Sequence, residues 1–412
     1  MKVSNYLKDI SILSAGTFIS QIILFIFIPI IAAIYSPAQF GISAFFIALG
    51  SILSALATGK YDFAVFSSNK ESTSIQFFFG SIFINLISSS LLIIFCLIIS
   101  PFFDEYFHFF ATVALIFLNG LNLSFTSWFN KAKDYKIIAI FRGCKNLFIG
   151  IFTIFFGLKF GDYSICIIFA NILGLSILLI VYLIYFLIKY SSLKKYLILS
   201  HIYKLLLSDF SYPLYSVPAS IVNVLSSQSP VIILKFLFGD SIAGIYALVN
   251  RVLGAPVDLI STSTGEVFRQ KASKYYNQRK KCTQLFSKTF TTLFKTALAP
   301  FFVIALFGPM IFSFFLGDDW EQAGYFSRYL SIFFLLRFSI SPLSFVLIIA
   351  KKQKYNLQWQ LSLLFITSLS LLLGYKQSNP DLSVVLYSFA YSIMYLIYYF
   401  KIKKTIEFDF KK

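Results

Sequence analysis

The sequence predicts an all-α polytopic membrane protein, with about twelve transmembrane helices in two pseudo-symmetric six-helix bundles. Three observations support this prediction: an apolar composition, loops that alternate in charge, and a weak internal repeat. Of the 412 residues, 58% are hydrophobic and only 13% are charged, which is far from the balance of soluble domains. The composition alone therefore places most of the chain in a bilayer.

Long apolar runs predict helices rather than a β-barrel. The run "IFANILGLSILLIVYLIYFLI" (168–188) carries no charge, and about 20 helical residues cross roughly 30 Å of hydrocarbon. A barrel would show short alternating segments instead. The polar breaks between runs predict helices near 10–34, 40–58, 75–100, 108–129, 136–158, 164–188, 212–238, 241–266, 285–316, 322–349, 356–374 and 382–400.

The loops between these helices alternate in charge. One side collects 28 of the 35 Lys and Arg residues, including the run "RQKASKYYNQRKKCTQLFSK" (269–288) and both termini. The other side carries Lys159 and Lys376 beside acidic turns such as "GDDWEQ" (317–322). Because cytoplasmic loops are rich in Lys and Arg, the basic side and both termini are predicted to be cytoplasmic. The net charge of +18 then reflects topology and contact with anionic membrane lipids, and no nucleic-acid partner is expected.

A weak repeat relates the two halves of the chain. Residues 35–66 can be laid over residues 238–268, with "FGISA" matching "AGIYA". Six helices per half is an even number, so both halves insert in the same orientation around an axis along the membrane normal. We therefore predict an N-terminal lobe over 1–188, a cytoplasmic linker over 189–211 and a C-terminal lobe over 212–412, with a substrate path between the lobes.

The segment "RVLGAPVDLI" (251–260) places Arg251 and Asp258 inside a predicted membrane helix. Seven residues are nearly two turns, so the two charges share one face about 10.5 Å apart, too far to neutralise each other fully. An ionised group at bilayer depth costs at least about 2.5–3.5 kcal/mol on insertion scales, so it normally faces a partner or a water-filled cavity. Asn250 beside Arg251 also suits a polar lining. We therefore place this helix on the lobe interface.

Further polar residues in the apolar runs are candidates for the same path. Arg337, Lys235 and Lys60 join Arg251 as predicted anion-binding cations. Asp258, Glu266 and Asp62 are predicted ion-coupling or gate residues, and Gln21 and Asn250 are predicted polar lining.

Each candidate also has a plainer interpretation. Lys235 can snorkel to the membrane surface. Arg337 can bond a carbonyl of a neighbouring helix, and Asp258 can balance Arg251 or the basic loop. Lys60 and Asp62 can form a local ion pair at a helix end. For Lys295 and Arg328 the sequence does not separate cavity lining from snorkelling.

The usual motifs of enzymes are absent. The chain has no Walker A motif, no G-x-S-x-G, no H-E-x-x-H and only two histidines. The four cysteines are scattered without metal-ligand spacing. No catalytic residue, metal or cofactor is predicted, and transport would run on an H⁺ or Na⁺ gradient, membrane potential or substrate supply.

The segment "SAGTFISQIILFIFIPIIAAIYSPAQFGISAFFIALGSILSALATGKYDFAVF" (14–66) resembles the N-terminal signature of bacterial polysaccharide repeat-unit flippases. These O-antigen translocases belong to the multidrug/oligosaccharidyl-lipid/polysaccharide (MOP) exporter superfamily. The matching positions are Gln21, Pro29, Tyr35, Ser36, Pro37, Phe40, Gly41, Lys60, Tyr61 and Asp62. Ala33 and Gln39 depart from the pattern, in which a basic residue and Glu are common, so one cationic contact near the outer end of the first helix is in doubt.

The resemblance implies two bundles that form a V around a central cationic cavity, which opens alternately to cytoplasm and periplasm. The implied cargo is an undecaprenyl-diphosphate-linked oligosaccharide for O-antigen, capsule or a similar polysaccharide. It would move from the cytoplasmic to the periplasmic leaflet of the bacterial plasma (inner) membrane. Implied partners are membrane lipids, a polysaccharide polymerase and a chain-length regulator. An Arg suits a pyrophosphate because it can bind two of its oxygens at once.

Three other functions remain open at this point. A cation-coupled multidrug exporter of the same superfamily should show a more acidic cavity, whereas the intramembrane charges here are mainly basic. A polytopic glycan polymerase or ligase would need a large external loop, and the predicted external loops are short. A scaffold protein would not explain an Arg inside a membrane helix.

Overall fold

The computed structural model describes residues 3–68, 70–99, 106–278, 282–350 and 352–409. Within these ranges there is no strand, and twelve helices are long and apolar enough to cross a membrane. The predicted all-α polytopic class is therefore confirmed. The described ranges leave out part of the predicted charge pattern, namely Lys2, Asp104, Glu105, Arg279, Lys280, Lys281, Lys351, Lys411 and Lys412.

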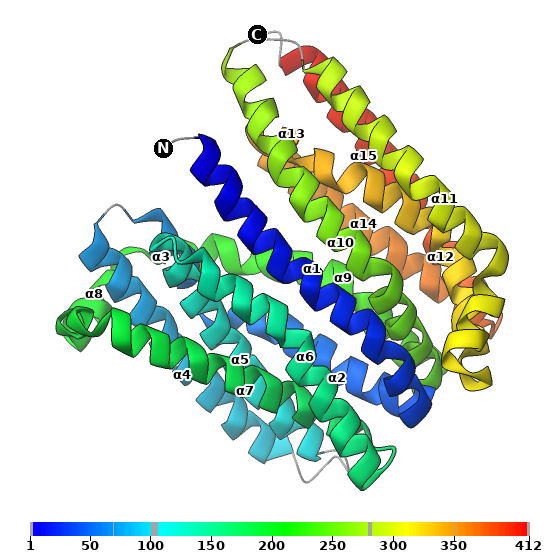
Figure 1. The fold of residues 1–412 in the computed structure, drawn as a ribbon, viewed down its shortest axis with the longest axis horizontal. Coiled ribbons are helices and arrows are strands. Elements are labelled where there is room, and N and C mark those ends of the chain that lie inside the picture. Colours follow the sequence, from blue (N-terminus) through cyan, green and yellow to red (C-terminus); the bar gives the residue numbers. More distant parts are fainter. Residues whose placement is uncertain (1–2, 69, 100–105, 279–281, 351, 410–412) are drawn as a thin grey trace. The chain divides into compact units, whose positions relative to one another are not determined.

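The chain forms two compact units (Figure 1). The first unit contains residues 1–35 and 42–228, and the second contains residues 36–41 and 229–412. The short segment 36–41 belongs to the second unit because it packs there. The rings of Phe40 and Trp320 are perpendicular, with their centroids 5.8 Å apart. The chain therefore passes between the units near residues 35, 41 and 228.

The first unit is built from long helices joined by short turns. Its elements are α1 (Val3–Ile34), α2 (Pro37–Ala57), α3 (Tyr61–Ser67), α4 (Glu71–Ile99), α5 (Tyr106–Lys131), α6 (Tyr135–Phe160), α7 (Ser164–Lys189), η2 (Ser191–Tyr196), α8 (Leu199–Ser208), η3 (Tyr212–Ser216) and α9 (Val217–Phe238). The first turn of α2 and the last turns of α9 lie in the second unit. Helix α1 packs on α6, α6 on α7, and α4 on α5.

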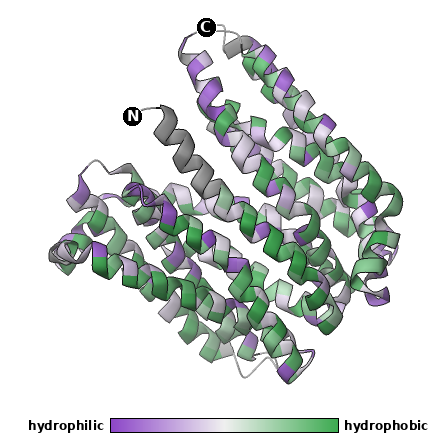
Figure 2. Cartoon of the chain, in the orientation of Figure 1, coloured by the Kyte–Doolittle hydropathy of each residue, from purple (hydrophilic) through white to green (hydrophobic). Residues whose placement is uncertain are grey.

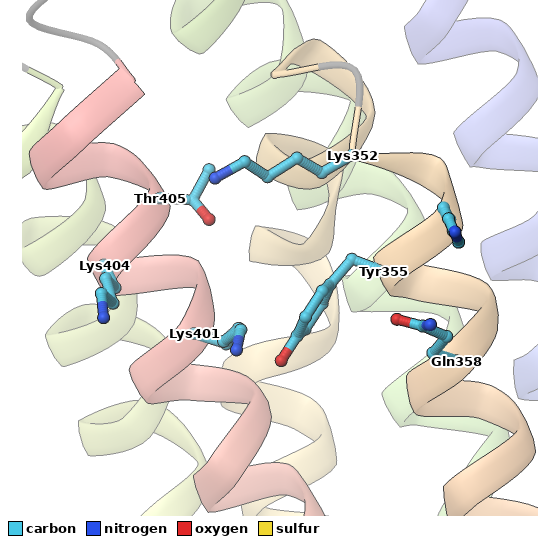
Figure 3. A pocket seen from close by; sticks show the side chains of 7 residues that line it. Lys352, Tyr355, Gln358, Lys401, Lys404 and Thr405 are labelled. Atoms are coloured by element: carbon cyan, nitrogen blue, oxygen red, sulfur yellow. The ribbon is translucent and has the colours of Figure 1, made fainter.

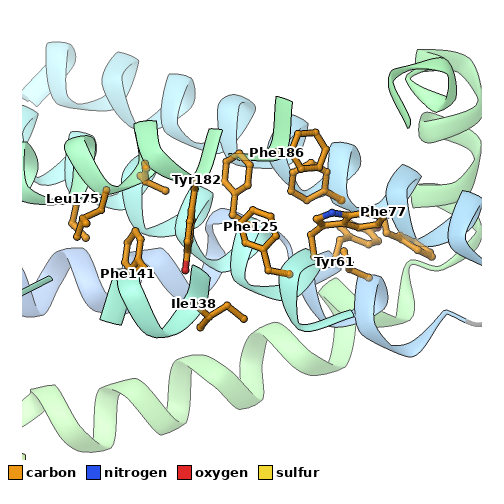
Figure 4. Packing of buried hydrophobic residues seen from close by; sticks show 14 of the residues in the cluster. Tyr61, Phe77, Phe125, Ile138, Phe141, Leu175, Tyr182 and Phe186 are labelled. Carbon is orange, nitrogen blue, oxygen red and sulfur yellow. The ribbon is translucent and has the colours of Figure 1, made fainter. Parts of the chain in front are cut away.

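Aromatic side chains fill the core of the first unit. Figure 4 shows the ring of Tyr182 from α7 lying between Phe141 of α6 and Phe125 of α5. The ring centroids are 4.5 Å apart for Tyr182 and Phe141 and 5.9 Å apart for Tyr182 and Phe125. Such ring pairs stabilise by about 0.5–1.5 kcal/mol beyond the area they bury. Apolar contact alone does not distinguish a neighbouring helix from lipid, so these ring pairs give α5, α6 and α7 specific contacts with one another.

The predicted linker 189–211 is structured and lies in the first unit. It forms η2 and α8, and α8 packs on α4 through its buried residues Ile202 and Leu206. The hydroxyl of Tyr61 donates a hydrogen bond to the carbonyl oxygen of Leu206 at 2.6 Å. The apolar spacing of four residues explains why this segment docks as a helix.

The second unit has a similar plan of long helices. Its elements are α10 (Asp240–Asn277), α11 (Thr283–Leu316), η4 (Asp318–Trp320), α12 (Glu321–Ile340), η5 (Ser341–Ser344), α13 (Phe345–Ile349), α14 (Gln353–Tyr375) and α15 (Pro380–Asp409). Helix α12 contacts α10, α11 and α15, and α14 packs on α15. The predicted helix 322–349 is interrupted by η5 because Pro342 cannot donate a backbone hydrogen bond.

Apolar side chains cover the helices along most of their length (Figure 2). Many are large and exposed, such as Phe314 at 80% and Phe365 at 69%. Exposed phenylalanine is costly in water and favourable in hydrocarbon. The exposed apolar faces therefore agree with a multi-pass membrane protein.

Candidate functional site

Helix α10 carries four of the predicted site residues on one continuous element. Gly239 adopts a positive φ of 87° directly before it, and the helix then runs unbroken past Asn250, Arg251, Asp258 and Glu266. Pro256 lies inside the helix between the two charges. An intramembrane helix with this many polar side chains needs partners or water for them.

Asp258 finds its partner on another helix. Arg337 of α12 donates a hydrogen bond from Nη2 to Oδ1 of Asp258 at 2.6 Å. The Arg337 side chain is 22% exposed and that of Asp258 is 61% exposed. The plainer interpretations are therefore replaced: Arg337 bonds a carboxylate rather than a carbonyl, and Asp258 balances Arg337 rather than Arg251.

Three tyrosines of α15 lie near Arg337. Tyr387, Tyr391 and Tyr395 all interact electrostatically with Arg337, and their rings follow one another at 5.5 and 5.3 Å. Tyr246 of α10 donates a hydrogen bond to the Tyr387 hydroxyl at 3.2 Å. The sequence prediction missed these tyrosines. Their spacing of four residues in "YSFAYSIMY" was the available signal, because it puts the three rings on one helix face.

Arg251 is half-buried, and no carboxylate of the described residues pairs with it. No hydrogen bond or ion pair joins it to any residue in the described ranges. Its neighbour Asn250 is also half-buried. A guanidinium that is partly removed from water without a counter-ion carries an unfavourable desolvation cost. An anionic ligand is the simplest group that would offset this cost.

The other two predicted cations lie elsewhere. Lys235 at the end of α9 forms an ion pair with Asp240 at the start of α10. Asp240 precedes Arg251 by eleven residues, which is roughly 16 Å along a helix. Lys60 lies in the first unit.

Lys60 sits in a tight turn between α2 and α3. Gly59 and Lys60 both have positive φ, 57° and 60°. The ammonium group of Lys60 lies 5.1 Å from the centroid of the Phe63 ring. Asp62 accepts a hydrogen bond from Oγ1 of Thr58 at 2.6 Å. No ion pair links Lys60 with Asp62 in the described part of the chain. The turn has backbone hydrogen bonds as well as the cation–π contact and the Thr58 bond.

The remaining candidates have these surroundings. Gln21 of α1 has a buried Oε1 without a hydrogen-bond partner among the described residues. Glu266 is half-buried and belongs to none of the three ion pairs found there. Lys295 is exposed on α11. Arg328 donates from Nη2 to the carbonyl oxygen of Leu306 at 3.0 Å, which joins α12 to α11. No group of three metal-ligating side chains occurs in the described ranges.

We expect the Asp258–Arg337 pair to show as a non-additive effect on stability. The variants Asp258→Asn and Arg337→Gln each remove one partner, so the double variant should cost less than the sum by about 0.5–1 kcal/mol. Thermal unfolding in detergent measures this. Glu266→Gln combined with Arg337→Gln is the matched control, because Glu266 is an α10 acid outside the pair. Additive losses for Asp258 and Arg337 would show that the pair contributes nothing.

Comparison with known proteins adds a family match. A family model described as "Polysaccharide biosynthesis protein" matches residues 6–269. Among curated proteins, none matches the chain.

Similar solved structures share the fold over nearly the whole chain. An inward-facing multidrug resistance MATE family transporter of the MOP superfamily has a TM-score of 0.72 at 13% identity, covering 96% of this chain and 93% of its own. The lipid II flippase MurJ, in an inward closed conformation, has a TM-score of 0.72 at 18% identity, with 96% and 89% covered. A MOP superfamily transporter from Pyrococcus furiosus has a TM-score of 0.67 at 14% identity, covering 98% of this chain and 96% of its own. At these identities the likeness concerns the fold.

Proposed function

The chain belongs to the polysaccharide biosynthesis protein family and has the fold of MOP superfamily transporters, and on this basis we propose that it is a lipid-linked oligosaccharide flippase. Its cargo would be an undecaprenyl-diphosphate-linked repeat unit of O-antigen, capsule or a similar polysaccharide. The protein would carry this cargo from the cytoplasmic to the periplasmic leaflet of the bacterial plasma membrane by alternating access.

The observation that supports this proposal most is that Arg251 has no hydrogen-bond or ion-pair partner among the described residues. A diphosphate is a doubly charged oxyanion, and a guanidinium can donate two parallel hydrogen bonds to it. Because the Arg251 side chain is half-buried, that contact is stronger than it would be at the surface. Arg337 would bind the diphosphate only if cargo binding weakens its bond to Asp258. The Asp258–Arg337 pair is therefore a candidate gate. Lys60, Lys235, Asp62, Glu266, Gln21 and Asn250 keep their predicted roles as proposals.

The mechanism follows from the chemistry of this cargo. The sugars and diphosphate are polar and cannot cross hydrocarbon unaided, whereas the polyprenyl tail is apolar and stays in the bilayer. We propose that a cationic cavity takes up the head group while the tail remains in lipid. H⁺ or Na⁺ coupling at Asp258 or Glu266 would reset the cycle. A polysaccharide polymerase and a chain-length regulator are the proposed partners.

The decisive test is deletion in a host with a known surface glycan. We expect lipid-linked repeat units to accumulate on the cytoplasmic leaflet and the surface glycan to be lost, with both restored by a plasmid copy. The alternative is a cation-coupled multidrug exporter, which shares this fold. Unchanged surface glycan together with greater sensitivity to cationic drugs would favour the exporter and overturn the flippase.

The topology is a separate expectation. We expect the 267–288 loop and both termini to be cytoplasmic, because the basic residues cluster there. A cysteine placed at the exposed Gln278 should resist a membrane-impermeant maleimide in intact cells, whereas one at the exposed Lys376 should react. Native Cys282 adds little background, because burial raises the pKa of its thiol to about 11 and keeps it protonated at pH 7. Labelling at 278 in intact cells would reverse the orientation.

A further inference from the structure

A cavity of about 530 Å³ opens between α14 and α15, and no residue of the proposed cargo site lines it. Figure 3 shows Lys352 reaching from the start of α14 toward α15, with Tyr355 and Lys401 facing each other below it. Four of the seven lining residues are lysines, and none is acidic. The lining is Lys352, Lys354, Tyr355, Gln358, Lys401, Lys404 and Thr405.

Helix spacing and a rigid aromatic support explain how the cavity forms. Lys401, Lys404 and Thr405 stand three and four residues apart, so they share one face of α15. One turn deeper, the Trp359 ring stacks on Tyr398 at 3.9 Å, and its Nε1 donates to the carbonyl oxygen of Met394 at 3.1 Å. The hydroxyl of Tyr398 donates to Oδ1 of Asn356 at 2.6 Å. These contacts join α14 to α15 and hold the cavity walls in place.

The charge of the cavity calls for an anion. The Lys401 ammonium lies 4.0 Å from the centroid of the Tyr355 ring, which orients it but leaves it positive. With four lysines and no acid in its lining, the cavity has a positive potential. The nearby acid Glu407 is on α15 but does not line the cavity. A phosphate oxyanion, which accepts several hydrogen bonds at once, suits such a lining.

The position of the cavity favours a lipid as the source of that phosphate. The two candidate spans are Lys354–Tyr375 and Pro380–Glu407, so the cavity lies where both spans end. One turn further into the spans, Leu361 is 46% and Ile397 is 51% exposed. A headgroup in the cavity would therefore have apolar surface beside it for its acyl chains. Basic pockets at the ends of membrane helices are suited to such headgroups.

We propose that this cavity binds the phosphate group of an anionic phospholipid and anchors the α14–α15 pair at the basic membrane face. A free phosphate ion offers the same oxyanion but no acyl chain, so the test must separate the two sources. The site does not depend on the proposed function, because no residue of the cargo site lines it.

The test measures the thermal midpoint of the purified protein in micelles with added phosphatidylglycerol, phosphatidylcholine or inorganic phosphate. We expect phosphatidylglycerol alone to raise the midpoint. The double variant Lys401→Gln/Lys404→Gln should need at least about tenfold more phosphatidylglycerol for the same rise. The control Lys376→Gln/Lys403→Gln removes the same charge from two exposed positions that do not line the cavity, one in the turn after α14 and one on α15, and should behave like the parent.

Two further variants keep the test interpretable. Lys401→Arg/Lys404→Arg retains the charge and should retain the response. Lys404→Gln alone alters one exposed side chain and carries the test if the double variant does not fold. Equal losses in the cavity and control variants, or a loss in neither, would overturn the proposal. An equal rise with inorganic phosphate would overturn the lipid as the ligand.

Discussion

We expect Arg251→Ala to lose most glycan export at normal protein levels, while Arg251→Lys retains part of it. The alanine variant removes a charge-assisted hydrogen bond worth roughly 1.5–3 kcal/mol, or about ten- to a hundred-fold in cargo binding. Lysine keeps the charge but offers only a point contact, so it should bind the diphosphate less well than arginine. Surface glycan and cytoplasmic lipid-linked repeat units, quantified together, measure the loss.

The control for this series is an exposed lysine of the same unit. Lys376→Ala also removes one positive charge, but Lys376 lies exposed between α14 and α15. We expect this variant to export at the parental rate. Parental export by Arg251→Ala, at matched protein levels, would show that Arg251 does not contact cargo. The binding site would then have to be sought around Arg337, Lys235 and Lys60.

We expect Gly244→Ala to destabilise the second unit more than any other small substitution in α10. A Cβ at Gly244 would lie 1.9 Å from the carbonyl oxygen of Pro37, and one at Gly41 would lie 1.8 Å from that of Asp240. Both clashes are with backbone, which cannot rotate away. Overpacking of this kind costs about 1–3 kcal/mol, and more where the backbone is held from both sides. Gly41→Ala should show a similar loss.

Gly254→Ala is the matched control for this prediction. It lies on the same helix, and its Cβ would meet only Asn250 and Phe334 atoms at 3.6 Å. Because alanine favours helix over glycine, this variant should be neutral or up to about 1 kcal/mol more stable. Thermal unfolding of the purified variants compares them. Equal midpoints for Gly244→Ala and Gly254→Ala would contradict the close packing of segment 36–41 on α10.

Gly41 and Gly244 also connect the internal repeat to the fold. The sequence alignment of 35–66 with 238–268 pairs these two glycines. In the structure each one meets the backbone that precedes the other, so two equivalent positions form one contact. The repeat was readable because it is a pattern along the chain. The close contact between the two glycines could not be predicted from the sequence, because a glycine in a helix can have several structural causes.

The sequence by itself determined the class of the protein and the number and approximate ends of its membrane helices. These follow from composition and from uncharged runs, which act locally along the chain. It also identified Arg251, Asp258 and Arg337 as unusual, because an intramembrane charge is costly wherever its partner lies.

Only the tertiary structure decided how those charges are paired. Asp258 bonds Arg337, 79 residues away, while Arg251, seven residues away on the same helix face, has no carboxylate partner in the part of the chain that the structure describes. The docking of α8 on α4 and the convergence of four lysines between α14 and α15 likewise depend on which helices are neighbours. Periodicity shows which face of a helix is polar or apolar, but interhelical packing selects the partner that this face meets.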